Sequence, residues 1–225
     1  MNTITDWQLS LGVDDILRGQ GADPQVVRAG KPLLMAVAER AITQGVGLIH
    51  PIALTHTLVV RQHRHTRILL EGGATLTGPL VTRHLAGAQR VVAAVCTIGP
   101  ELEGAITQWL PEDPAYAMAL DGLGNAAVEI LSQQVCGRIA EQVQVEGLQA
   151  STPLSPGNPE WAVGIGQPQI FALLDPSEAG ITLTSGGMMI PKKSVSFVLG
   201  LGSEMSQAGL CEVCSLKDTC RYRRA

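Results

Sequence analysis

The sequence predicts a chain of mixed helices and β-strands, and three segments carry that prediction. Residues 52–70 (IALTHTLVVRQHRHTRILL) combine β-branched side chains with a polar centre, which suits a β-hairpin. Residues 91–98 (VVAAVCTI) form a short apolar run that stops at Gly99 and Pro100, as a buried strand stops at a turn. Residues 115–145 follow a proline-containing loop and have the length and composition of a long helix.

Smaller elements are expected on either side of these three. Residues 24–45 carry apolar side chains at helical spacing, and Pro32 marks either the true start of this helix or a kink. Residues 101–109 predict a helix that ends before Pro111. The last elements expected are a short helix over 167–174 and strands over 180–184 and 194–200.

Charge and hydropathy exclude two classes of protein. The net charge of −4 argues against a general nucleic-acid binder, which needs a basic surface to displace counterions from phosphates. No run of eighteen or more residues is free of charged and turn-forming residues, so we expect no membrane span. The first residues show no basic segment followed by an apolar run, which favours a cytoplasmic protein.

Three of the five cysteines lie close together near the end of the chain, as Cys211-x2-Cys214-x5-Cys220. This spacing indicates a metal centre, because two thiolates two residues apart can bind one ion from a single tight turn. Zinc and an iron–sulfur cluster are both candidates, and a disulfide is the third possibility. We expect two parts in the chain, a body over 1–205 and a metal-binding tail over 206–225. Cys96 and Cys136 are expected to be small buried apolar residues of the body.

The long predicted helix carries an unusual polar stripe. Between residues 115 and 136 its only charged side chains are Asp121 and Glu129, and Asn125 lies between them at helical spacing. The stripe is either the solvent face of the helix or the wall of a ligand site.

Two loops follow this helix. In TPLSPGNPEW, Pro156 and Gly157 predict a rigid turn that can present backbone groups to a ligand. In SGGMMIPKK, Lys192 and Lys193 either face an acidic partner or keep the loop soluble.

The order of these segments resembles a known family. SPGNPEW, then Gln167 with IFALLD, then GITLTSGGMMIPKKSVSFVLG is similar to the activation domain of cobalamin-dependent methionine synthase. VCTIGPELE and ALDGLGNAAVE look like segments of small stand-alone relatives of that domain. The similarity spans residues 90–203, and Met-x-Pro-x-x-Ser-Val-Ser is its most specific element. It implies an α+β fold in which helices flank a twisted antiparallel sheet in a C-shaped body.

The resemblance also implies a site. The family's domain binds S-adenosylmethionine and docks on the corrinoid, where one electron and one methyl group restore the methylated state from cob(II)alamin. The ligand-binding residues that it implies here are Pro156, Gly157, Asn158, Met188, Met189, Ser194 and Ser196, with Asp121 and Glu129 on the preceding helix. Met188 and Met189 either face the corrinoid or fill the core.

This chain departs from the family pattern at the first loop. The family's loop arginine falls on Pro153 and its tyrosine on Asn158, while Ser185, Gly186 and Gly187 replace a Glu-Ser pair. An arginine can hold a carboxylate through two hydrogen bonds, and neither residue here can do so. We therefore expect weakened binding of S-adenosylmethionine.

Two functions are compatible with this sequence. In the first, the protein is a reductive activator of a corrinoid protein or cobalamin-dependent methyltransferase, and an iron–sulfur cluster on Cys211, Cys214 and Cys220 passes one electron from an electron donor. In the second, a non-redox module binds S-adenosylmethionine or another small molecule and zinc holds the tail. Cys96, Cys136 or a non-cysteine group could supply the fourth ligand of the cluster, or one iron could remain without a protein ligand. Whether the chain is itself an enzyme is left open.

Overall fold

The structure, a computed structural model, describes residues 1–158 and 160–205. The predicted tail at 206–225 therefore lies outside the described residues. The described helices are α1 (Val13–Gly19), α2 (Pro24–Gly30), α3 (Pro32–Gly45), α4 (Pro79–His84), α5 (Glu101–Trp109), α6 (Pro114–Gln144) and α7 (Val163–Phe171), with 3-10 turns η1 (Val46–Leu48), η2 (Glu71–Gly73) and η3 (Pro176–Ala179). The described strands are β1 (Asn2–Ile4), β2 (Ile52–Arg64), β3 (Arg67–Leu70), β4 (Thr75–Thr77), β5 (Arg90–Thr97), β6 (Gln149–Ala150), β7 (Thr182–Leu183), β8 (Met189–Ile190) and β9 (Ser194–Gly202).

The main sheet is antiparallel in every described pairing. Its strand order is β4-β3-β2-β5-β9-β6, and β1 adds to β2. The predicted hairpin is β2 and β3, which meet at Arg64 and Arg67. The predicted apolar strand is β5, which lies between β2 and β9 along its full length. β7 and β8 form a separate two-stranded ribbon.

Strand alternation divides the core into two layers. Along β5, Val92, Ala94 and Cys96 face the helix α6, while Val91, Ala93 and Val95 face the opposite layer. All of these side chains are buried, since helices or loops cover both faces of β5. A strand covered on both faces must be apolar throughout, which explains the continuous run VVAAVC.

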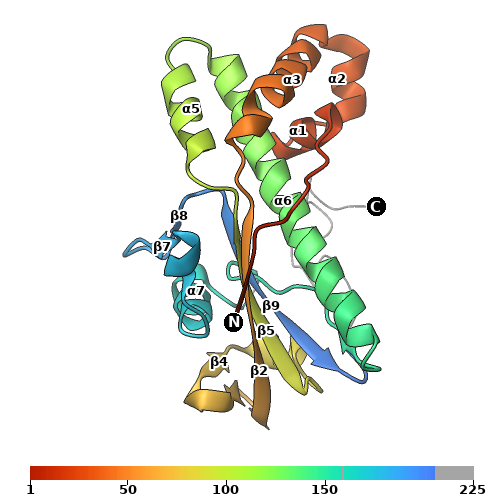
Figure 1. The fold of residues 1–225 in the computed structure, drawn as a ribbon, viewed down its shortest axis with the longest axis vertical. Helices are drawn as coiled ribbons and strands as arrows, with labels where there is room; N and C mark the ends of the chain where they lie inside the picture. Colours follow the sequence, from red (N-terminus) through yellow and green to blue (C-terminus); the bar gives the residue numbers. More distant parts are fainter. Residues whose placement is uncertain (159, 206–225) are drawn as a thin grey trace.

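The helices are arranged unequally around the sheet (Figure 1). α6 runs from the helical end of the molecule along one face of the sheet, and α1, α3 and α5 pack on its N-terminal half. α7 packs on β9 and β4, on the side of the ribbon formed by β7 and β8. This arrangement confirms the predicted α+β class with an antiparallel sheet flanked by helices. Among the described helices, none combines the length and apolar character that a membrane span requires.

Two predicted helices are placed differently by the structure. Residues 24–45 form two helices, because Pro32 is the first residue of α3 and restricts Lys31 to a non-helical conformation (φ −136°, ψ 64°). The helix expected over 167–174 is α7, which begins at Val163 and includes Pro168. It starts earlier than predicted, in spite of its glycines, and Gly166 lies so close to its neighbours that an added Cβ would be 2.8 Å from Trp161.

The strand bounds near the end of the body also differ from those predicted. The strand expected over 180–184 is reduced to Thr182–Leu183, and the strand expected over 194–200 continues to Gly202. Short or isolated elements gave no clear sequence signal and were missed: β1, α1, α4, β4, β6 and β8.

Candidate functional site

Two loops that the sequence singled out meet at the N-terminus of α7. We call residues 153–158 the Pro-Gly loop and residues 184–191 the Met loop. A Cβ added to Gly166 of α7 would lie 2.9 Å from Pro156 of the Pro-Gly loop. A Cβ added to Gly187 of the Met loop would lie 3.5 Å from Val163. The start of α7 therefore lies between the two loops and contacts both.

The Pro-Gly loop is held by its own hydrogen bonds. The Gly157 amide donates to the carbonyl of Trp161 at 2.8 Å, and Gly157 has a φ of 98°, which favours glycine. The Asn158 Oδ1 accepts a hydrogen bond from the Ser155 amide at 2.8 Å. Asn158, where the family has its tyrosine, therefore stabilises the turn with its side-chain oxygen.

Helix α4 fixes the loop at both ends. His84 shares a hydrogen bond with the carbonyl of Thr152 at 2.7 Å, and Arg83 forms an ion pair with Glu160 at 2.9 Å. The order of the loop thus comes from contacts with an element that the sequence did not predict. The indole nitrogen of Trp161, which is buried beside the loop, has no hydrogen-bond partner among the described residues.

The Met loop separates its two methionines. Met188 is 57% exposed, whereas Met189 is half-buried and packs against the core layer on the α7 side of the sheet. The Met188 amide donates to Thr184 Oγ1 at 3.1 Å, and the Thr184 amide donates to the Met188 carbonyl at 2.8 Å. The sequence left open whether the pair faces a ligand or fills the core; Met189 packs on the core in part, and Met188 is exposed. The Ile190–Pro191 peptide bond is cis.

Exposed apolar side chains occur on both of these contacting segments. Four large apolar residues of α7 and the Met loop are at least one-third exposed, and we call them the apolar surface: Val163, Ile165, Met188 and Ile190. Exposed apolar groups that cluster on neighbouring segments are typical of a binding surface, whereas single ones are ordinary.

The two predicted serines are internal to the body. The Ser196 hydroxyl lies 2.6 Å from Gln167 Oε1, and both residues are buried. The Ser194 hydroxyl lies 2.9 Å from Thr97 Oγ1 and donates to the Pro191 carbonyl at 2.7 Å. The two serines therefore connect β9 to neighbouring segments. Ser196 contacts α7, and Ser194 contacts the end of β5 and the end of the Met loop.

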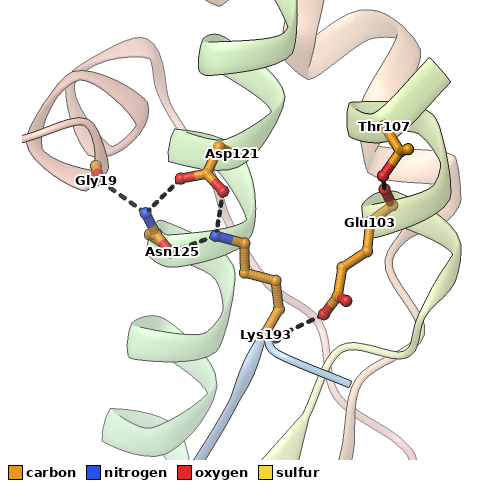
Figure 2. Close-up of polar contacts among 6 residues, drawn as sticks. All are labelled: Gly19, Glu103, Thr107, Asp121, Asn125 and Lys193. Atoms are coloured by element: carbon orange, nitrogen blue, oxygen red, sulfur yellow. Dashed lines mark hydrogen bonds and ion pairs between the residues drawn. The ribbon is translucent and has the colours of Figure 1, made fainter. Parts of the chain in front are cut away.

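The polar stripe of α6 contacts Lys193, for which the sequence left two interpretations open. Lys193 is 9% exposed, and its Nζ lies 2.6 Å from Asp121 Oδ1 and 2.7 Å from Asn125 Oδ1 (Figure 2). The prediction that Lys193 faces an acidic partner or keeps the loop soluble is wrong, since its partner is within the chain. Lys192, in contrast, is exposed. Glu129 is exposed and accepts a hydrogen bond from Gln133 at 2.8 Å.

The alternation of residues along the strand in the sequence indicates this contact. Lys193 lies an even number of residues before Val195, Phe197 and Leu199, whose side chains all belong to the layer facing α6. In an extended strand such residues share one face, so Lys193 must point at the same helix. The nearest polar positions on that helix are the ones in the stripe.

The body offers little to a metal. Within the described residues no group of three or more histidines, cysteines or acids lies in position to hold one. Burial raises the pKa of the Cys96 thiol well above its ordinary value. Burial, and secondarily the charge of Glu129, raises the pKa of Cys136 to about 12. Both thiols therefore stay protonated at neutral pH, as expected for apolar core residues. Cys211, Cys214 and Cys220 lie outside the described residues.

Comparison with known proteins rests on the fold. No protein-family model matches the chain, and no curated protein matches it. Its fold is similar to that in the crystal structure of the MetH reactivation domain bound to AdoHcy, with a TM-score of 0.65. The alignment covers 91% of this chain and 74% of that chain at 15% sequence identity. The two chains share a fold, and it is the fold that the sequence resemblance predicted.

Proposed function

We propose that this protein is an accessory factor that reactivates a corrinoid protein or a cobalamin-dependent methyltransferase. The observation that carries the proposal is the apolar surface at the meeting of α7 and the Met loop. It lies within the segments whose sequence resembles the activation domain, on a body that has the fold of the MetH reactivation domain. A corrinoid ring presents a broad, largely apolar face, and an apolar surface on ordered loops is complementary to it.

The loops are ordered before any partner arrives, which favours docking. The Pro-Gly loop closes on itself through Asn158, and α4 holds its two ends. A preformed surface loses less conformational entropy on binding than a flexible one. The exposed side chains Met188 and Ile190 then provide the contact area, and methionine adapts its shape to an irregular partner.

The electron is proposed to come through the tail. An iron–sulfur cluster on Cys211, Cys214 and Cys220 fits the spacing of three thiolates, and zinc would fit it without redox chemistry. If bound there, such a cluster would supply one electron for the reduction of cob(II)alamin to cob(I)alamin, and a one-electron donor protein would have to reduce the cluster again. Cys96 is a poor candidate for a fourth ligand, because its side chain is fully buried in the core layer between β5 and α6.

Metal analysis after anaerobic purification tests the redox part of the proposal. We expect bound iron with acid-labile sulfide and visible absorbance that is bleached by dithionite. Substitution of Cys211, Cys214 and Cys220 by serine should remove the iron and leave the body folded. A colourless protein that contains only zinc would contradict electron transfer through the tail and support the alternative of a non-redox binding module.

Titration with cob(II)alamin tests the docking part separately. We expect the wild-type protein to perturb the cob(II)alamin absorbance spectrum and the Met188→Glu variant to bind at least tenfold more weakly, because a charge on the apolar surface must be desolvated (about 1.4 kcal/mol for each factor of ten). Leu110→Glu is a matched control, since Leu110 is similarly exposed (54%) but lies at the end of α5. Equal binding by both variants would contradict docking at this surface.

A further inference from the structure

We propose that Lys193 is a positioning residue that holds the Met loop in its binding arrangement through an ion pair with Asp121 of α6. The inference rests on the proposed function, because it is that function which makes the Met loop a binding element. It goes beyond that function by assigning the control of the loop to a contact with α6, which lies in the other core layer from α7 and Met189.

The contact has the geometry of a specific anchor. Lys193 Nζ donates to one oxygen of Asp121 at 2.6 Å and to Asn125 Oδ1 at 2.7 Å (Figure 2). Asn125 in turn donates from Nδ2 to the other oxygen of Asp121 at 3.1 Å. The cation, the carboxylate and the amide therefore satisfy one another in a closed ring of hydrogen bonds.

The backbone of Lys193 is held as firmly as its side chain. Its amide donates to Glu103 Oε1 of α5 at 2.9 Å, and its carbonyl accepts from the Ile98 amide at 3.2 Å. Lys193 thus joins the beginning of β9 to α5, α6 and the end of β5. A residue that is held at both its backbone and its side chain restricts the position of the residues just before it.

Room for the lysine is built into α6. A Cβ added to Gly124 would lie 3.0 Å from Lys193 Cε and 3.1 Å from its Cδ, closer than ordinary packing allows. The lysine stem therefore packs across the backbone of α6 at a glycine. This close passage explains how the ammonium group reaches Asp121 while the stem stays buried.

The helix that receives the lysine is itself fixed in place. Asn125 Nδ2 also donates to the carbonyl of Gly19 at the end of α1, at 3.0 Å. α1 and α6 approach so closely there that a Cβ on Gly19 would lie 2.2 Å from the Gly122 carbonyl oxygen. A continuous set of polar contacts therefore runs from the packed helical layer to Lys193, the second residue beyond the Met loop.

The effect reaches the Met loop over a very short distance in sequence. Only Lys192 separates Lys193 from Pro191, and the Ser194 hydroxyl donates to the Pro191 carbonyl at 2.7 Å. Pro191 directly follows Ile190 of the apolar surface. If the lysine lost its carboxylate partner, the unpaired ammonium group would favour a more solvated position, and we expect the backbone contacts of Lys193 and the end of the loop next to it to loosen.

Hydrogen exchange measured by mass spectrometry tests the anchor without any ligand. We expect Lys193→Met to accelerate exchange of the Met loop amides while the amides of β5 keep their protection. Lys192→Met makes the same chemical change at the neighbouring exposed residue and should leave the loop as in the wild type. Asp121→Asn keeps the shape of the partner without its charge, so it should loosen the same amides.

Titration with cob(II)alamin then links the anchor to function. We expect Lys193→Met and Asp121→Asn to bind about tenfold more weakly than the wild type, since an unordered loop must be ordered on binding. Wild-type binding with no loss in either variant would overturn the role of Lys193. Exchange that accelerates equally in the Met loop and β5 in both variants would also overturn it, because the pair would then serve only global stability. Absence of binding by the wild type would overturn the proposed function, and the exchange experiment would still decide the anchor.

Discussion

Burial determines the chemistry of the two cysteines of the body. Cys96 is fully buried on β5, facing α6, and Cys136 lies half-buried on that helix. Desolvation disfavours a thiolate, so the pKa of Cys136 rises from 9.0 to about 12 and that of Cys96 rises as well. Because these thiols bind their protons more tightly in the folded state, their contribution to stability is complete below pH 9.0 and is lost as the pH rises above it.

Alkylation at the residue level checks this assignment. At pH 8 we expect iodoacetamide to leave Cys96 and Cys136 unmodified in the folded protein and to modify both in urea, as peptide mass spectrometry would report. Chelator-treated protein should react first at the tail cysteines. Modification of Cys136 in the folded protein at a rate similar to that in urea would contradict its high pKa.

At the scale of an element, α6 contains glycines with opposite environments. Gly122 lies against α1, where an added Cβ would be 2.7 Å from the Ile16 carbonyl oxygen and 2.5 Å from Gln20 Cγ. Gly137, in the same helix, has no atom of another described segment within 4 Å of its Cβ position. The first glycine therefore permits helix packing, and the second only lowers helix propensity.

The two alanine substitutions should change stability in opposite directions. Gly122→Ala should destabilise the protein by about 1–3 kcal/mol, since α1 must move away from α6. Gly137→Ala should stabilise it by about 0.5–1 kcal/mol through helix propensity alone. Urea unfolding followed by circular dichroism measures both. Stabilisation by Gly122→Ala would contradict the close approach of the two helices.

Elements with strong local patterns were predictable, and those formed by contacts between distant segments were not. The hairpin and β5 followed from β-branched runs, and α6 from its length and composition. The helix α7 begins among glycines, and the fit of Gly166 against Trp161 is a contact that local propensity cannot reveal. Lys193 was expected either to face an acidic partner or to keep the loop soluble, because a lysine usually is exposed, whereas its acceptor lies 72 residues away in the chain.

The candidate site was predictable in its segments and less so in its side chains. The resemblance placed the Pro-Gly loop and the Met loop together, and the structure brings both against α7. It could not show that Ser194 and Ser196 are internal contacts or that Met188 and Met189 face different surroundings. A shared fold determines where the segments of the site lie. The contacts of each side chain depend on the neighbouring residues of this particular chain.

At the scale of the whole molecule, the fold of an AdoHcy-binding domain is combined with a loop that lacks the family's ligand contacts. Pro153 is exposed and carries no charge, and Asn158 is occupied within its own turn. Neither can hold the carboxylate of S-adenosylmethionine as a guanidinium does. The body is therefore expected to have kept the docking surface and lost most of its affinity for this ligand.

Restoring the two family residues tests this expectation. We expect Pro153→Arg combined with Asn158→Tyr to bind S-adenosylmethionine at least tenfold more tightly than the wild type by calorimetry, since a charge-assisted hydrogen bond contributes about 1.5–3 kcal/mol. Pro153→Lys with the same tyrosine is the matched control, because it restores the charge without the planar pair of donors and should gain less. Wild-type binding as tight as that of the restored variant would mean that other residues of the site hold the carboxylate. In that case the residues at 153 and 158 would not weaken the binding of S-adenosylmethionine. The alternative function, a non-redox module that binds a small molecule, would then be the better explanation.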